Sequence, residues 1–211
     1  MMKKIQLTSK DKILKAALAI FIAKGKDGAS MQEIADEAGV NKAMLFYYYT
    51  SKDLLYGEVL RTNILEIVNS IKNIFISEED SEKKIEQIVN AYVDFFDSQP
   101  HLPKLILREI ASNASELTKV IKELKQQLEA DIPHKFISLI QQSLSSQGAP
   151  SIEAKHAIIS IIGMSIIYFI GKPIIDILLE IENVNHEELI LQRKKNIMFI
   201  LKHGIFFKES Q

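Results

Sequence analysis

The stretch "SMQEIADEAGVNKAMLFYYYTSK", residues 30–52, contains the most specific structural pattern of this chain. Ser30 and Glu33 form a capping box ahead of a short helix with an apolar face, and Gly39 is a left-handed stop at its end. Asn41 is suited to cap a second short helix after a tight turn. This pattern predicts a helix-turn-helix, whose second helix enters the DNA major groove, although an αα-hairpin of any helical protein has similar features.

Four consecutive aromatic residues end this stretch, from Phe46 to Tyr49. Successive side chains of a helix point about 100° apart, so these rings cannot all face one core. Leu45 and Tyr49 are four residues apart and share a face, which we expect to be buried. Tyr47 and Tyr48 point away from that face. Their hydroxyl groups are therefore free to donate to phosphate oxygens, a contact that sets register without reading sequence.

The charge of the chain is unevenly distributed. The 211 residues have a formal net charge of −1. Residues 1–52 hold nine Lys and five acidic residues, which gives +4, and residues 53–211 hold 17 basic and 22 acidic residues, which gives −5. The absence of cysteine excludes disulfides and fits a reducing cytoplasm, and the first residues do not resemble a signal peptide. The positive end is the one with the aromatic run, and we predict a cytoplasmic protein.

Helical periodicity continues along the rest of the chain, and no alternating strand pattern is convincing. We predict an all-α fold of about nine helices, with a three-helix N-terminal domain and a larger helical domain. Pro133 should kink or split the longest segment near Asp131. The predicted helices are 11–24, 31–38, 42–49, 51–76, 82–97, 104–112, 116–146, 151–181 and 185–206.

One segment, residues 157–171, is apolar apart from two serines and a tyrosine. It is shorter than the roughly 20 residues that a membrane-spanning helix needs, and Lys172 and Pro173 follow it. A helix that is apolar all round is more often a core helix. We therefore predict no membrane association, and a helix that needs a large partner surface.

Residues 13–55, from "ILKAALAIFIAKG" to "AMLFYYYTSKDLL", resemble the DNA-binding domain of the TetR family of bacterial transcriptional regulators. The matching features are the end of the first helix, the Ile34-Ala35 and Ala38-Gly39-Val40 core, the aromatic run and Lys52. The phrase "QPHLPKLILRE", residues 99–109, also resembles a junction common in the family. The resemblance implies a DNA-binding domain at 1–52 and a ligand-binding and dimerisation domain at 53–211, with the helix from 51 linking them.

The resemblance implies a set of DNA-contacting residues. Lys52 matches the family's phosphate clamp, beside the phosphate contacts expected of the two exposed tyrosines. Phe46 stands where a tyrosine is more usual, which favours an apolar contact. Ser30 and Asn41 have competing roles as caps and phosphate contacts, and Lys3 and Lys4 could reach a minor groove or belong to a disordered terminus. Base reading is expected of Gln32, Lys42, Ala43 and Phe46.

The resemblance also implies a homodimer and an effector pocket. The last two predicted helices, 151–181 and 185–206, would form a four-helix bundle with their copies, because Ser160 and Gly163 allow close approach. A small, largely hydrophobic effector would bind inside each larger domain and release a repressor from a palindromic operator. Ordinary core packing is the competing interpretation for every pocket candidate. The candidates are Tyr92, Phe95, Phe96, Phe136, Ile140, Met164 and Tyr168.

Two other classes of function remain open in the sequence. A protein of the same fold could bind DNA for a structural or division-linked role without responding to a ligand. Catalysis is disfavoured because the five histidines show no metal-ligand spacing, and no glycine-rich loop or nucleophile elbow is present. We expect no enzyme activity, no metal and no cofactor.

Overall fold

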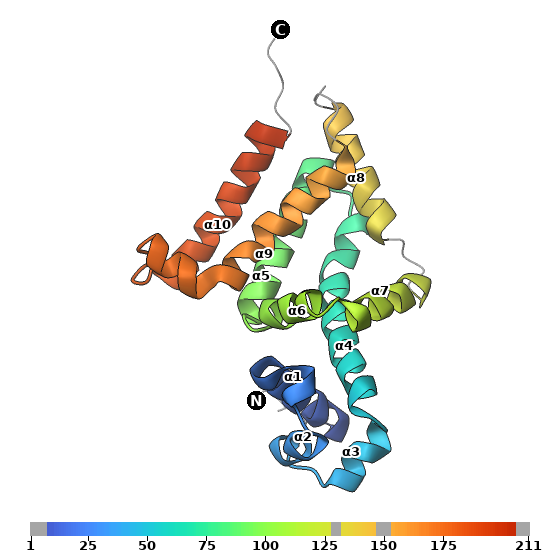
Figure 1. Ribbon diagram of the computed structural model, residues 1–211. Helices are drawn as coiled ribbons and strands as arrows, with labels where there is room; N and C mark the ends of the chain where they lie inside the picture. The colour runs from blue at the N-terminus through green and yellow to red at the C-terminus, as the bar shows by residue number, and fades with distance from the viewer. Residues whose placement is uncertain (1–7, 128–131, 147–152, 206–211) are drawn as a thin grey trace, which may run out of the picture. The chain divides into compact units, whose positions relative to one another are not determined.

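The computed structural model describes residues 8–127, 132–146 and 153–205, and all of the regular structure in these ranges is helical (Figure 1). This confirms the predicted all-α class. The described residues form two compact units. Unit 1 contains the residues up to Leu65 together with Lys104–Gln127, and unit 2 contains Glu66–Pro103 and the described residues from Ile132 onward. The lysines at positions 3 and 4 lie outside the described residues.

Unit 1 begins with α1 (Ser9–Gly28), which packs against α2 (Met31–Ala38). Thr8 caps α1 through a capping box with Asp11. The helical backbone is interrupted at Gly25, where φ is 74°, a conformation that glycine adopts without steric cost. The predicted end of the first helix at this glycine is therefore confirmed, although one more turn follows it.

The second and third helices have the predicted caps. Ser30 accepts a hydrogen bond from the backbone of Glu33, whose carboxylate accepts from the Ser30 backbone in return. Gly39 is left-handed, with φ 65° and ψ 36°, and its N–H donates to carbonyl oxygens at the end of α2. Asn41 caps α3 (Lys42–Tyr48) by accepting from Met44. The helix-turn-helix is thus specified by local hydrogen bonds as well as by its buried face.

Unit 1 is completed by the first part of a long helix, up to Leu65, and by the segment Lys104–Gln127. The long helix α4 (Lys52–Lys72) starts where Ser51 accepts from the Leu54 backbone, as predicted, and a short 3₁₀ turn, η1 (Asn73–Ile76), follows it. The other segment consists of α6 (Leu102–Ala111) and α7 (Ser115–Gln127). Asn113 and Ala114 in the turn between α6 and α7 have φ of 78° and 52°, a strained conformation for alanine.

Unit 2 is organised around α5 (Ser81–Ser98), which packs against α8 (Ile132–Ser146), α9 (Ala154–Leu178) and α10 (His186–Ile200) (Figure 1). A π-helical turn, η2 (Leu201–Ile205), follows α10. Asn185 caps α10, as predicted, by accepting a hydrogen bond from the backbone N–H of Glu188.

The described residues contain ten α-helices, against a prediction of about nine. The extra helix comes from the segment 116–146, which is divided into α7 and α8. The second of these begins immediately before Pro133, because proline has no N–H to donate and is accommodated in the first turn of a helix. The predicted division of this segment is confirmed, and its predicted position near Asp131 lies outside the described residues.

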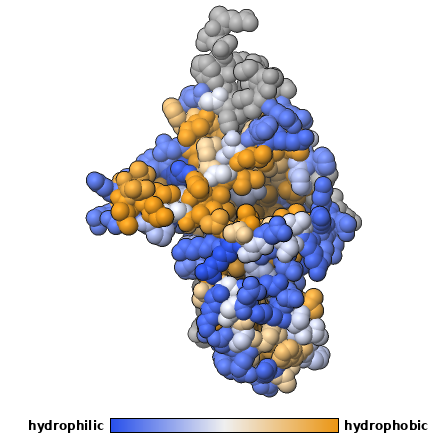
Figure 2. All heavy atoms as spheres, viewed as in Figure 1, coloured by the Kyte–Doolittle hydropathy of each residue, from blue (hydrophilic) through white to orange (hydrophobic). Residues whose placement is uncertain are grey.

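The single chain leaves much of α9 exposed. By length and composition this helix could cross a membrane, yet only 22% of its most apolar window is buried. Ile159 is 66% exposed and Ile167 is 53% exposed. Figure 2 shows hydrophobic residues gathered on the surface of unit 2. No element in the described part of the chain covers the outer face of α9, so the large partner surface that the sequence predicts for this helix stays a prediction.

Candidate DNA-binding and effector sites

The outer surface of α3 carries the predicted base-reading and phosphate-contacting residues. Leu45 is fully buried and Tyr49 is 7% exposed, as predicted for the inner face of the aromatic run. Tyr47 is 84% exposed, and its ring meets that of Tyr48 edge-on, with 5.4 Å between centroids. The side chains presented to solvent along this helix are those of Lys42, Ala43, Met44, Phe46, Tyr47 and Tyr48, all but Met44 being predicted DNA-contacting residues.

Three further predicted DNA-contacting residues already have partners inside the chain. Ser30 and Asn41 act as helix caps, so capping is confirmed for both, and their contact with phosphate stays a prediction. The amide group of Gln32 is exposed and donates to Asp36 over 2.8 Å. A Gln32 that read a base would first have to leave this carboxylate.

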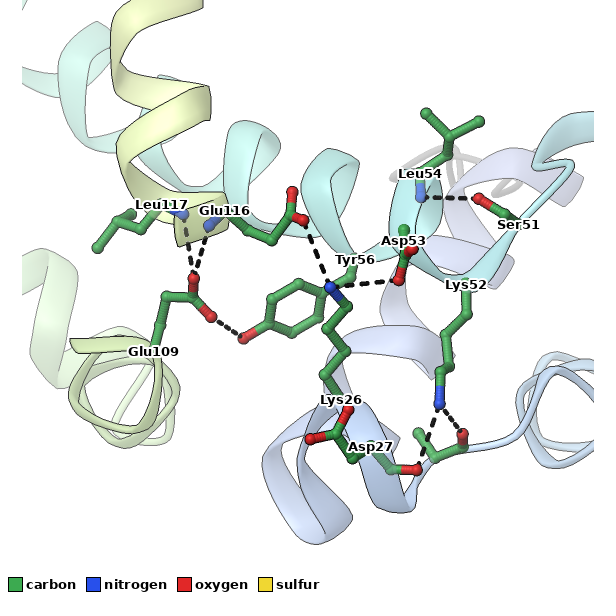
Figure 3. A network of polar contacts seen from close by, with 11 residues as sticks. Lys26, Asp27, Ser51, Lys52, Asp53, Leu54, Tyr56, Glu109, Glu116 and Leu117 are labelled. Carbon is green, nitrogen blue, oxygen red and sulfur yellow. Dashed lines mark hydrogen bonds and ion pairs between the residues drawn. The ribbon is translucent and has the colours of Figure 1, made fainter. Parts of the chain in front are cut away.

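Lys52 is held by backbone oxygens in the absence of DNA. Its Nζ donates to the carbonyl oxygen of Ala29 at 2.9 Å and to that of Asp27 at 3.3 Å (Figure 3). These carbonyls lie at the end of α1, where helical partners run out, so the ammonium group satisfies them. Lys52 therefore connects the beginning of α4 to the end of α1. Its role as a phosphate clamp stays a prediction.

A buried carboxylate, that of Glu109 on α6, joins three elements of unit 1 (Figure 3). Its Oε2 accepts from the hydroxyl of Tyr56 on α4 at 3.0 Å. Its Oε1 accepts from the backbone N–H groups of Glu116 and Leu117, at 2.9 and 3.2 Å, and so caps the first turn of α7. Burial, and then the bond to Glu109, raise the pKa of Tyr56, which stays protonated and donates. A carboxylate with three donors is well compensated for its burial.

Lys26 extends this network toward the DNA-binding helices. Its Nζ lies 3.2 Å from the carboxylate of Asp53 and 3.4 Å from that of Glu116, and 5.4 Å from the centre of the Tyr56 ring. Burial acts to lower the pKa of Lys26, but its bonds with Asp53 and Glu116 outweigh burial and raise that pKa. Asp53 is the neighbour of Lys52 in the chain. The start of α4 is thus connected to α1 and α7 by charge-assisted contacts.

This network was not predicted from the sequence, although the segment 99–109 contains its central residue, Glu109. Arg108 and Glu109 end the phrase at 99–109, where two charges follow an apolar run. The Arg108 guanidinium donates to the Ile22 carbonyl at 2.6 Å, on the turn of α1 just before Gly25. Paired charges at the end of an amphipathic helix were a usable signal, but their partners are 53 and 86 residues away.

The seven predicted effector-binding residues all lie in unit 2. Phe95 and Phe96 have ring centroids 5.4 Å apart, and Phe96 lies 6.1 Å from Phe169 of α9, which in turn meets Tyr168 at 5.2 Å. Phe136 is buried separately against Phe75, at 6.2 Å. Ile140 is fully buried, whereas Tyr92 and Met164 are half-buried. An aromatic cluster of α5 and α9 thus brings three of the seven together.

One surface hollow of unit 2, of about 450 Å³, involves other residues. It lies along α5 and α10 and combines apolar side chains with lysines. Its apolar lining consists of Leu191, Met198 and Phe199, and none of the predicted effector-binding residues contributes to it. In the described parts of the chain, no three His, Asp or Glu side chains are grouped as metal ligands.

The capped helix-turn-helix with an exposed, aromatic second helix defines a DNA-binding protein of the transcriptional regulator class. The family of tetR bacterial regulatory proteins matches residues 13–59. The chain is 32% identical over 152 residues to the transcriptional regulator RutR of Escherichia coli, covering 72% of this chain and 69% of RutR. The protein belongs to the TetR family of transcriptional regulators.

Two further relatives extend the comparison. The transcriptional activator FasR of Mycolicibacterium smegmatis is 32% identical over 94 residues, which are 44% of this chain and 43% of FasR, so the match spans less than half of that relative. The crystal structure of the regulator FadR of Bacillus subtilis in complex with stearoyl-CoA has the same fold, with a TM-score of 0.69 and 12% identity. That likeness covers 92% of this chain and 97% of FadR.

Proposed function

We propose that this TetR-family regulator is a repressor that binds a palindromic operator as a homodimer and is released by a small, largely hydrophobic effector. The observation that carries the DNA-binding half of this proposal is the surface of α3, on which Tyr47 is 84% exposed while the other face is buried. The buried face of α3, with Leu45 and Tyr49, is sufficient to pack this helix against the rest of its domain. The exposed side chains of Lys42, Phe46, Tyr47 and Tyr48 are not needed for that packing, and contact with DNA explains their presence.

Each exposed group has a distinct proposed role on DNA. Lys42 donates to guanine O6 or N7, Gln32 pairs with adenine, and Ala43 and Phe46 meet thymine methyl groups or sugars. Tyr47 and Tyr48 donate to phosphates, and Ser30 and Asn41 add phosphate contacts while remaining caps. Lys52 exchanges its carbonyl partners at the end of α1 for a phosphate oxygen. The start of α4 then moves little, because Lys26 continues to hold Asp53.

The proposed dimer forms through α9 and α10. Along α9, Ile159, Ile162 and Ile167 are exposed at 66%, 39% and 53%, and on α10 Phe199 is exposed at 61%. Ser160 and Gly163 lie exposed among the isoleucines, which permits close approach of a second helix. A second copy across a two-fold axis would cover this surface without any membrane. Two recognition helices held about 34–36 Å apart would then read a palindrome, one half-site each.

The effector is proposed to carry a long apolar part. In unit 2 the aromatic cluster of Phe95, Phe96, Phe169 and Tyr168 contains three of the residues predicted to bind it. The FadR structure that shares this fold holds stearoyl-CoA, which favours an acyl chain as the first class to test here. A regulator that binds DNA and a metabolite acts in the cytoplasm, and we propose no enzymatic activity for it.

Selection of bound DNA from a random pool by the full-length protein tests the proposal. We expect enrichment of one palindrome, and loss of the enrichment when Lys42 and Tyr47 are replaced by Ala. An enriched but non-palindromic site would contradict the dimeric reading. No enrichment over bulk DNA would favour the alternative, a TetR-fold protein bound to DNA in a structural or division-linked role.

Calorimetric titration of an apolar ligand against free protein and against the protein–operator complex tests the effector half. Because coupling between two sites is reciprocal, a ligand that weakens DNA binding is itself weakened by DNA, typically about 5- to 150-fold. Equal ligand affinity in both states would show that the ligand does not control DNA binding. A ligand that bound the complex more tightly would identify an activator or a co-repressor mechanism.

A further inference from the structure

A group of polar side chains interrupts the apolar surface of α9 and meets α10. Tyr168, Lys172 and Asp176 are spaced four residues apart, so they lie on one stripe of α9. Lys172 is paired with Asp176, and its Nζ lies 5.5 Å from the centre of the Tyr168 ring. Arg193 comes from α10 and donates through Nη2 to the carbonyl oxygen of Met164, one turn before Tyr168. Two cations and one carboxylate therefore surround a tyrosine.

Several polar atoms of this group are buried without a hydrogen-bond partner among the described residues. They are the hydroxyl of Tyr168, Nε of Arg193 and Oδ1 of Asp176. The bond with Asp176, and after it the interaction with Tyr168, raise the pKa of Lys172, but Lys172 can only donate to that hydroxyl and leaves its proton without an acceptor. Tyr168 as a whole is only 5% exposed. Arg193 as a whole is half-buried, and burial lowers its pKa, while its interaction with Tyr168 acts in the opposite direction. A buried donor without an acceptor is costly, so the two donors require an acceptor from another molecule.

The unpartnered donors border the aromatic cluster. The ring of Tyr168 contacts Phe169, and Phe169 contacts Phe96 on α5. On the other side of Tyr168, Lys172 Nζ lies 5.5 Å from the centre of its ring, and Arg193 meets α9 one turn earlier through the Met164 carbonyl. One end of this arrangement is thus apolar and aromatic, and the other is positively charged. That polarity matches a molecule with an apolar chain and an anionic head.

We propose that Arg193 and Tyr168 bind the anionic head group of an amphiphilic effector whose apolar chain lies along the aromatic cluster. A carboxylate has two oxygens, and it can accept from Nε of Arg193 and from the Tyr168 hydroxyl together. Lys172 stays with Asp176, so the group as a whole offers one net positive charge to the head. This inference rests on the proposed function, because it assigns the head-group contact of the same effector.

The test compares two ligands that differ only at the head, laurate and dodecanol, by calorimetric titration of the full-length protein. We expect the wild type to prefer laurate. Replacing Arg193 by Met keeps an unbranched side chain and removes the donors, so laurate binding should weaken about tenfold or more while dodecanol binding stays unchanged. Tyr168→Phe should show the same selectivity with a smaller loss. Arg61→Met in unit 1 is the matched control and should alter neither ligand.

Thermal unfolding of the ligand-free variants separates a head-group contact from a structural role. Removing a half-buried cation that has no acidic partner among the described residues should leave the Tm of Arg193→Met equal to or above that of the wild type. A lowered Tm with equal weakening of both ligands would overturn the proposal, as would a wild type that does not prefer laurate or binds neither ligand.

The experiments distinguish an incorrect head-group site from an incorrect effector function. If laurate preference depends on Arg193 but laurate leaves operator binding unchanged, the head-group site stands and effector control fails. If a neutral apolar ligand releases the operator and Arg193→Met has no effect on laurate, effector control stands and the head-group site is wrong. The Arg193→Lys variant adds a further check, because a cation without Nε should recover only part of the laurate affinity.

Discussion

The two compact units of the protein differ in how completely their buried polar groups are hydrogen-bonded. In unit 1 the Glu109 carboxylate has three donors, and the buried Tyr56 hydroxyl donates to it. In unit 2 the Tyr168 hydroxyl and Nε of Arg193 are equally inaccessible but have no partner among the described residues. One exception lies in unit 1, where the buried Tyr49 hydroxyl is also unpartnered and burial raises the pKa of Tyr49 to about 12.

The same contrast applies to apolar surface. Unit 1 exposes apolar side chains such as Leu54, Ile110 and Ile121 on separate helices, and its exposed rings are confined to α3. In unit 2, α9 and α10 expose a series of isoleucines, leucines and a phenylalanine. Polar pairs satisfied within the chain indicate a unit that is complete by itself. Unpaired donors and uncovered apolar helices are the features that the proposed second copy and effector would complete. The difference therefore separates the residues that build the fold from those proposed to bind a second copy and an effector.

The largest effect is expected at the uncovered surface of unit 2. Ile162→Glu places a carboxylate in the proposed bundle, where an unpaired buried charge costs roughly 3–5 kcal/mol. Sedimentation should show monomers. The control is Ile121→Glu on α7, because Ile121 is 49% exposed, similar to Ile162 at 39%, and lies outside the proposed interface. An Ile162→Glu protein that stays dimeric would refute the interface.

The next effect concerns the paired network of unit 1. Glu109→Ala leaves the Tyr56 hydroxyl and two backbone N–H groups of α7 without their acceptor, so the free energy of unfolding should fall by about 3 kcal/mol. Tyr56→Phe removes one donor and should cost about 1 kcal/mol. Urea titration measures both, with exposed Glu37→Ala as the control. An unchanged stability of Glu109→Ala would show that unit 1 does not depend on its internal pairing.

A smaller effect distinguishes phosphate contacts from base contacts. Lys52→Ala should weaken binding to all DNA sequences alike and reduce the salt slope by roughly one per half-site, because one counterion fewer is released there. Lys42→Ala should instead change the preferred bases. Lys52→Ala also removes the two hydrogen bonds from Lys52 to backbone carbonyls. The variant should therefore have a free energy of unfolding about 1 kcal/mol lower in the absence of DNA. If the variant altered base preference and kept the salt slope, the clamp assignment would be wrong.

The smallest effect is a titration in the capping box of α2. The hydrogen bond from Lys24, followed by those from Ser30, lowers the pKa of Glu33 from 4.5 to about 2. A depressed folded pKa means that this stabilisation is present above pH 4.5 and is lost as the pH falls toward 2. NMR titration of Glu33 should give a midpoint near 2, and Lys24→Ala should move it upward. A midpoint already at 4.5 in the wild type would contradict these contacts.

Local chemistry made much of unit 1 predictable. The capping box at Ser30, the left-handed Gly39 and the Asn41 cap each depend on residues within three or four positions of one another, and all three are present. The burial of Leu45 beside an exposed Tyr47 followed from helix geometry alone. By contrast, Glu109 meets Tyr56 across 53 residues, and nothing in the local pattern specifies that pairing.

The sequence alone therefore determined the class of the protein, because a capped helix-turn-helix is encoded by short-range hydrogen bonds and one buried stripe. It also indicated that residues 157–171 need a covering surface, since their composition is apolar on every side. Only the tertiary structure decided which polar groups lack partners, such as Arg193, whose neighbours Met164 and Tyr168 come from another helix. Satisfaction of a buried donor depends on what packs against it, and that packing is a property of the folded chain.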